Sequence, residues 1–136
     1  MKDERRQYVI YVAGKLFDDD PAEEELNINI ARNWSERIWL AGFTAICPHL
    51  NTLGICRKAK EGGTMTGEDF LEGDFHILDR CDGIFMIPEN WKISPGAHEE
   101  LEHAKKNGQM VFYKFENLLL HNWRDPWAID LDGDNE

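Results

Sequence analysis

Two acidic residues, Glu100 and Asp74, fall where helices of this sequence should turn toward the protein core. An α-helix advances about 100° per residue, so Glu100 shares a side of its helix with Ala97 and Leu101. By the same rule, Asp74 lies at the margin of the apolar stripe that contains Leu78. Paired carboxylates beside a ligand crevice can divide glycosidic-bond cleavage between a nucleophile and an acid or sugar-binding group.

A purely structural interpretation fits each acid when it is taken alone. Charged side chains are mostly solvated, and the margin of a buried stripe lets a carboxylate reach water or meet a Lys or Arg. The chain would then be an α/β domain with no ligand at these positions. The same arrangement on two helices favours the catalytic interpretation.

Four short apolar runs alternate with helical patterns and predict the elements that position these acids. The expected strands are residues 8–14, 43–48, 82–88 and 109–115. The expected helices lie within residues 18–42, 66–81 and 94–108. This rhythm predicts right-handed crossovers, and therefore an α/β fold with a mostly parallel sheet.

Capping patterns mark where the helices begin. Asp20 is expected to be the N-cap of the first helix, and Thr66 and Asp69 have the spacing of a capping box at the second. Gly42 is expected to end the first helix. The buried face of the first helix is expected to comprise Leu26, Ile30, Trp34, Ile38 and Ala41.

Parallel sheets bind ligands beyond the carboxyl ends of their strands, which sets the expected ligand edge. Ser94 should cap the third helix, and the exposed N–H groups of that helix start are also a seat for a phosphate. For His49 and Trp91, capping of a backbone group and packing over a loop are alternative roles. The residues expected to contact a ligand are Gly14, Lys15, His49, Trp91, Ser94, Gly96 and Ala97.

Composition excludes several classes of function. The formal net charge of −11 opposes binding to a nucleic acid polymer. No apolar run approaches the roughly 20 residues that span a bilayer, and the start "MKDERRQYVIYVAG" is not a signal peptide, so a cytoplasmic location is expected. The spacing of the five His and three Cys predicts no metal site, and no cofactor is expected. We expect a single domain over 1–127 and an acidic tail over 128–136.

Three motifs resemble the nucleoside 2-deoxyribosyltransferase-like superfamily, which includes the 2′-deoxynucleoside 5′-phosphate N-hydrolases. They are "Y-V-A-G" at 11–14, "D-x-x-x-L-x-x-C-D" at 74–82 and "W-x-x-S-x-G-A-x-x-E" at 91–100. The segment "GFTAICPHLN" at 42–51 fits the second strand of phage and bacterial members. The resemblance covers roughly residues 8–115.

The resemblance implies a flavodoxin-like, three-layer fold with four to five strands, in a homodimer or larger homo-oligomer. It implies that Glu100 is a nucleophile attacking the anomeric carbon of a nucleoside or deoxynucleoside 5′-monophosphate. Asp74 would hold the sugar hydroxyls or assist departure of the base, and Tyr11 would position the nucleophile. Water as acceptor gives a hydrolase, and a second base gives a transferase.

The resemblance leaves the substrate open. Ser94 stands where transferases of the superfamily commonly carry an acid and where the nucleotide hydrolases carry a phosphate-binding serine, which favours a monophosphate. The first loop, "GKLFDDD", departs from the Ser and Arg pattern of those hydrolases. The base, the sugar and the acceptor are not assigned. A nucleotide sensor without turnover and a structural oligomer without ligand are the alternative functions.

Overall fold

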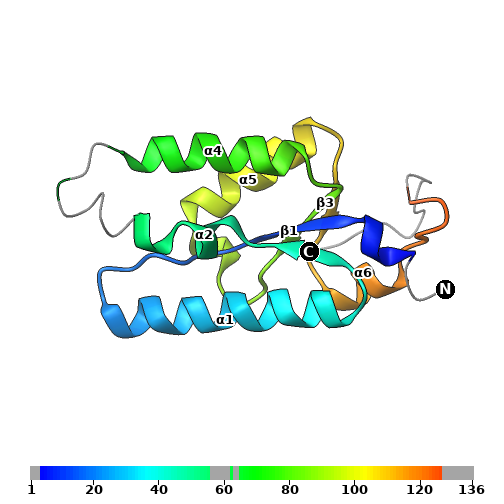
Figure 1. Cartoon of the computed structure of the whole chain (residues 1–136), viewed down its shortest axis with the longest axis horizontal. Coiled ribbons are helices and arrows are strands. Elements are labelled where there is room, and N and C mark those ends of the chain that lie inside the picture. Colours follow the sequence, from blue (N-terminus) through cyan, green and yellow to red (C-terminus); the bar gives the residue numbers. More distant parts are fainter. Residues whose placement is uncertain (1–3, 56–61, 63–64, 127–136) are drawn as a thin grey trace.

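In the described part of the chain, four parallel strands form one sheet with helices on both faces (Figure 1). The structure is a computed structural model, and it describes residues 4–55, 62 and 65–126. The strands are β1 (Val9–Ala13), β2 (Thr44–Ile46), β3 (Gly83–Met86) and β4 (Met110–Phe112), in the order β2-β1-β3-β4. This confirms the predicted α/β three-layer fold and is consistent with a flavodoxin-like sheet. The predicted acidic tail at 128–136 lies outside the described residues.

The helices divide between the two faces of the sheet. α1 (Pro21–Leu40) and α6 (Phe115–Leu120) lie on one face, and α4 (Gly67–Asp79) and α5 (Pro95–Lys106) lie on the other (Figure 1). The short helix α2 (Pro48–Asn51) follows β2, and the 3₁₀ turns η1 (Arg5–Gln7) and η2 (Trp91–Ile93) precede β1 and α5. No helix in the described ranges has the length and apolar character to cross a membrane.

Strand β1 shows how the sheet separates its two faces. Successive side chains of a strand point to opposite faces. Ile10 and Val12 therefore join the core under α1 and α6, whereas Tyr11 and Ala13 join the core under α4 and α5. All four are fully buried. The alternation places one polar side chain, Tyr11, on the face that α4 and α5 cover.

The predicted helix starts are confirmed. The Asp20 carboxylate accepts a hydrogen bond of 3.0 Å from the Ala22 N–H. Thr66 and Asp69 form the predicted capping box, each bonding to the backbone of the other. Such caps bond N–H groups that have no partner inside the helix, and so fix where each helix begins.

The predicted buried face of α1 is wrong at Leu26, in the second turn of the helix. Leu26 is 51% exposed, and the buried residues of the helix are Asn27, Ile28, Ala31 and Ile38. The face is shifted because Asn27 turns inward and its amide donates to the Leu16 carbonyl at 3.3 Å. Apolar periodicity alone does not foresee a buried amide that is held by its hydrogen bonds.

Asn90 connects the loops that follow β1 and β3. Its side-chain oxygen accepts from the Lys15 N–H at 2.9 Å, and its amide donates to the Lys15 carbonyl at 3.3 Å and to Asn27 Oδ1 at 3.4 Å. A Cβ on Gly14 would lie 2.6 Å from Asn90 Oδ1 and 2.8 Å from Ile87 Cδ1. The bridge between the two loops therefore needs a residue without a side chain at position 14.

We predict that Gly14→Ala lowers the free energy of unfolding by about 1–3 kcal/mol, because the added methyl group displaces the Asn90 bridge. Urea denaturation measures this change. Gly73→Ala is the matched control, since a Cβ at Gly73 meets no atom within 4 Å and the residue lies inside α4. The control should gain roughly 0.5–1 kcal/mol from its higher helix propensity. Equal effects of the two substitutions would contradict the crowding at position 14.

Candidate active site

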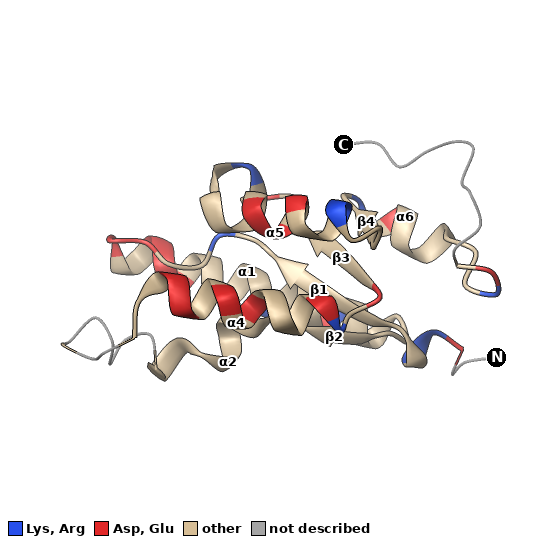
Figure 2. Ribbon diagram, turned by 90° about the horizontal axis from the view of Figure 1, so that it is seen from above, with Lys and Arg blue, Asp and Glu red and all other residues tan. Residues whose placement is uncertain are grey.

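Glu100 is a carboxylate enclosed by the protein. It lies in α5 on the side that also carries Ala97, Leu101 and Ala104, and its exposed fraction is 0%. Figure 2 shows other acidic residues on α4 and α5, and those at Glu99 and Glu102 are exposed. The predicted inward orientation of Glu100 is confirmed. Because charged groups are buried only at a cost, this position needs a compensating environment.

Tyr11 supplies a hydrogen bond to Glu100 from the sheet. Its hydroxyl donates to Glu100 Oε2, so β1 and α5 meet through a phenol and a carboxylate. Burial, together with the charge of Glu100, raises the pKa of Tyr11 far above its ordinary value. The phenol therefore keeps its proton and remains a donor to the carboxylate.

Asp74 brings the second carboxylate to the site from α4. Its side chain is 6% exposed, so the residue predicted at the margin of the helix is buried. One oxygen of Asp74 and one of Glu100 lie within 4.8 Å of each other. Glycosidases that form a covalent intermediate hold their two carboxyl groups about 5–5.5 Å apart, whereas those that place a water between them need at least about 6.5 Å. The pair has the closer spacing.

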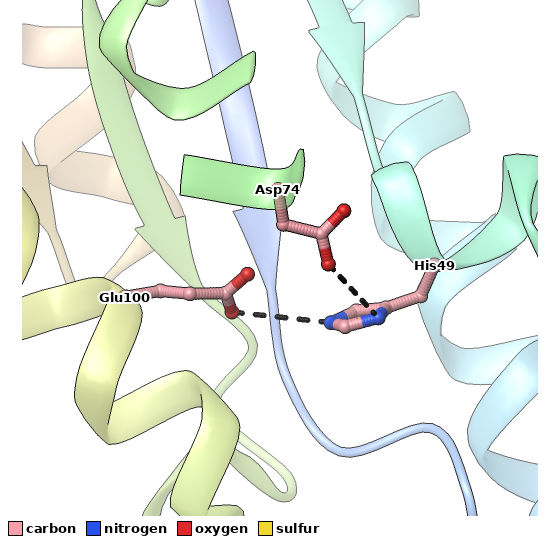
Figure 3. Close-up of side chains that lie close together, drawn as sticks. All are labelled: His49, Asp74 and Glu100. Atoms are coloured by element: carbon pink, nitrogen blue, oxygen red, sulfur yellow. Dashed lines mark ion pairs between the residues drawn. The ribbon is translucent and has the colours of Figure 1, made fainter. Parts of the chain in front are cut away.

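His49 faces both carboxylates and comes from α2, directly after β2 (Figure 3). Its Nδ1 is 3.7 Å from Asp74 Oδ2, and its Nε2 is 3.9 Å from Glu100 Oε1. Both separations are ion-pair distances and exceed those of hydrogen bonds. The His49 side chain is 18% exposed, more than either carboxylate. The imidazole is therefore the most accessible of the three side chains.

The pKa values of Asp74 and His49 are shifted by their surroundings. Burial raises the pKa of Asp74 to about 6; His49 opposes this shift and Glu100 adds to it. Burial alone would lower the pKa of His49, but the carboxylates of Glu100 and Asp74 outweigh it and raise that pKa. Groups that titrate near neutral pH can donate and accept protons under physiological conditions.

One oxygen of the buried Glu100 has no hydrogen bond. Glu100 Oε2 accepts from Tyr11, while Oε1 has no hydrogen-bond partner among the described residues. A buried polar atom without a partner is uncommon and calls for an explanation. Here the unpaired oxygen is the one that faces His49, so it points into the cluster.

The other expected ligand contacts lie near this edge with partners of their own. Lys15 Nζ forms an ion pair of 2.8 Å with Asp18, and the Ser94 hydroxyl caps α5 by accepting from the Ala97 N–H at 3.1 Å. Trp91 is buried and packs against Tyr113. Gly96 is half-buried in the first turn of α5. Ligand contacts at these positions, and at Gly14 and Ala97, stay predictions.

A cavity of about 730 Å³ lies away from the carboxylates, beside the amino ends of β1 and β2. Arg5 and Arg6 line it, but their guanidinium groups donate to the backbone carbonyls of Ala41, Leu119 and Trp39. These arginines therefore bond the carbonyls at the ends of α1 and α6. The cluster of Tyr11, His49, Asp74 and Glu100 is the better candidate site. Its polar groups face one another, and the pKa values of Tyr11, His49 and Asp74 are shifted.

Sequence reasoning missed two features of this region. Asn27 and Asn90 hydrogen-bond to the loop that follows β1. In the sequence they are marked only as amide residues, one within a helix and one within a loop. The prediction of no metal site considered His and Cys spacing along the chain. Three donors from α2, α4 and α5 nevertheless come together in space as His49, Asp74 and Glu100.

A comparison with protein families identifies the chain. A family model described as "Domain of unknown function (DUF4406)" matches residues 8–113. The chain belongs to this family. The match runs from the residue before β1 to the residue after β4 and includes all four members of the cluster. A search of curated proteins found no match. The family description gives no activity, so a function for this DUF4406 domain must be argued from its site.

The raised pKa of Asp74 predicts a pH-dependent cost to stability. The pKa is about 6 in the folded protein and 3.8 ordinarily, so between these pH values the folded state binds more protons than the unfolded state. Ionisation of Asp74 therefore lowers stability as the pH rises through this range. Asp74→Asn, which stays neutral, should raise the free energy of unfolding at pH 7.5 by up to about 3 kcal/mol and change it little below pH 4.

Urea denaturation at pH 4, 5, 6 and 7.5 measures this difference. Glu72→Gln removes an exposed acid from the same helix and should leave the pH dependence of wild type intact. An Asp74→Asn variant that is less stable than wild type at pH 7.5 would show that the contacts of the carboxylate outweigh its cost of burial.

Proposed function

We propose that this protein cleaves, or exchanges the base at, the N-glycosidic bond of a nucleoside or deoxynucleoside 5′-monophosphate through a glycosyl ester on Glu100. The observation that carries the proposal is the state of Glu100, a fully buried carboxylate with one oxygen held by Tyr11 and the other without a hydrogen bond. Oriented, desolvated carboxylates of this kind act as nucleophiles in glycosyl transfer. The resemblance of the surrounding motifs to nucleoside 2-deoxyribosyltransferases supports the same assignment.

In the proposed first step, Glu100 Oε1 attacks the anomeric carbon and forms the ester bond. The N-glycosidic bond breaks, and its electron pair stays on the departing base, which takes up a proton. Asp74, with a pKa of about 6, is suited to donate that proton or to hold the sugar hydroxyls. Tyr11 keeps the attacking carboxylate oriented through its hydrogen bond to Oε2.

In the second step, water or another base attacks the anomeric carbon, and the ester C–O bond breaks to regenerate the Glu100 carboxylate. The proton of the attacking water or base passes to a general base, for which the Asp74 carboxylate left by the first step is placed. The acceptor decides whether the enzyme is a hydrolase or a transferase.

A sugar can reach Glu100 only if side chains that cover it move, because Glu100 has no exposed surface. His49 is the proposed moving residue, since it lies within ion-pair distance of both acids and is the most exposed of the three side chains. A bound sugar would then take its place beside the carboxylates. His49 would then be free to contact the substrate at the edge of the site.

A 5′-monophosphate is the proposed form of the substrate. The first turn of α5 presents Ser94 as a neutral donor beside N–H groups, which suits a phosphate better than a carboxylate there would. Lys15 is the proposed cation for the phosphate. To bind it, Lys15 would have to leave its ion pair with Asp18 or contact the phosphate and Asp18 together. A homodimer or larger homo-oligomer is proposed on the resemblance alone.

A nucleotide sensor without turnover is the second candidate. It is favoured by the closed site, in which the proposed nucleophile has no exposed surface. The sensor would use the same fold and bind the same ligands, with His49 movement as the response. Base release separates the two functions.

We predict that wild-type protein releases free base from one or more deoxynucleoside 5′-monophosphates, measured by chromatography over a panel of nucleosides and monophosphates. Glu100→Gln should lower the rate by about a thousandfold or more, because it removes the nucleophile while keeping its size. Tyr11→Phe should lower it about ten- to a hundredfold through loss of orientation. Repeating each reaction with a second base distinguishes exchange from hydrolysis.

Glu99→Gln is the matched control, since Glu99 is the exposed neighbour of Glu100 on the same helix. It should keep the wild-type rate. Thermal unfolding checks that each variant is folded. Ligand-dependent stabilisation of wild type without any base release would reject the enzyme in favour of the sensor.

A further inference from the structure

Donor atoms of His49, Asp74 and Glu100 lie close enough together to be ligands of one metal ion. One donor atom from each side chain lies within 4.8 Å of the other two. For any such triangle, a point exists within 4.8 Å divided by the square root of three, or about 2.8 Å, of all three atoms. Zn²⁺ binds imidazole nitrogen and carboxylate oxygen at about 2.0–2.2 Å. Each donor atom would therefore need to move by less than about 1 Å to reach the ion, which small side-chain rotations allow.

The unpaired oxygen of Glu100 indicates a cation as occupant. Glu100 Oε1 is buried, accepts no hydrogen bond within the described structure and faces His49 Nε2 at 3.9 Å. Asp74 Oδ2 stands 3.7 Å from the other imidazole nitrogen. Two buried carboxylates at this spacing repel each other, and a divalent ion between them would neutralise both.

We propose that His49, Asp74 and Glu100 bind one divalent transition-metal ion of the Zn²⁺ type. Three protein donors leave a fourth position for water, the arrangement of an open zinc site. An imidazole with two carboxylates suits Zn²⁺, whereas Mg²⁺ prefers oxygen donors and keeps several of its waters. The site is unlike a surface acidic cluster, because its donors come from three elements that the fold fixes.

Tyr11 would serve this metal site as an outer partner. Its hydroxyl donates to Glu100 Oε2, which leaves Oε1 as the oxygen directed at the ion. Groups that hydrogen-bond to metal ligands orient them and raise affinity. Tyr11 is therefore a positioning residue for the metal, since it contacts the ligand and not the ion.

Metal and sugar would occupy the same carboxylates, so they would exclude each other. This consequence alone rests on the proposed function. Zn²⁺ bound to Glu100 would also remove the electron pair that attacks the anomeric carbon. The ion would then act as a reversible inhibitor and not as a cofactor of glycosidic cleavage.

The test is isothermal titration calorimetry of the full chain, stripped with EDTA and titrated with ZnCl₂ or MgCl₂. We expect one Zn²⁺ per chain at the site and at least about tenfold weaker binding of Mg²⁺. His49→Gln and Asp74→Asn should each weaken Zn²⁺ binding at least about tenfold, and Tyr11→Phe should weaken it about tenfold. His103→Gln is the matched control, because it removes a histidine paired with Asp79 on the surface and should leave the affinity unchanged.

Several results would overturn the site. They are absence of Zn²⁺ binding by wild type, retention of full affinity by both His49→Gln and Asp74→Asn, and loss of binding in His103→Gln. Circular dichroism checks the fold of each variant, and if His49→Gln does not fold, Asp74→Asn decides. The visible spectrum of the Co²⁺-loaded protein, which reports nitrogen and oxygen ligation, must likewise change in the folded variant.

A titration in the presence of a deoxynucleoside 5′-monophosphate separates the two proposals. Zn²⁺ binding that is weakened beyond the chelation of Zn²⁺ by the free nucleotide supports both the metal site and a shared ligand site. Unchanged Zn²⁺ binding together with no base release would contradict the proposed function and support the metal site. Base release without Zn²⁺ binding would support the proposed function and contradict the metal site.

Discussion

The structure depends on keeping the carboxylate of Glu100 fully buried. An isolated buried charge is costly, and one phenol cannot hydrogen-bond both of its oxygens. The sheet contributes Tyr11 from below, α4 contributes a second acid and α2 contributes an imidazole. Four elements, β1, α2, α4 and α5, therefore each contribute one polar side chain to the cluster. Glu100 would be the costliest of them to bury without the others.

The surrounding scaffold is arranged to hold these groups in place without sharing their chemistry. Alternation along β1 sends Ile10 and Val12 to the opposite face, so the apolar core under α1 does not compete with the site for space. The Asn27–Asn90 bridge fixes the loops at the carboxyl ends of the strands. Each face of the sheet has its own apolar core, and the polar cluster lies at the edge of the core under α4 and α5.

Local sequence patterns predicted the secondary-structure elements of this protein better than they predicted the contacts between distant residues. The four strands, the three long helices and their caps follow from apolar runs and from Asp20 and Thr66, because these signals act within a few residues. The helical phase also predicted that Glu100 turns inward. The phase of α1 failed at Leu26, since a buried amide is decided by partners on distant loops. The contacts of His49 with both acids depend on the tertiary structure, and the spacing of these residues along the chain does not predict them.

The close approach of the two carboxylates has a consequence for stereochemistry. Oxygens of Glu100 and Asp74 lie within 4.8 Å, the shorter spacing typical of glycosidases that retain the configuration of the anomeric carbon. If Glu100 acts as proposed, each turnover inverts the anomeric carbon twice. A new base would therefore join the sugar on the same side that the old base left, and the spacing of the two carboxylates would determine the configuration of the product.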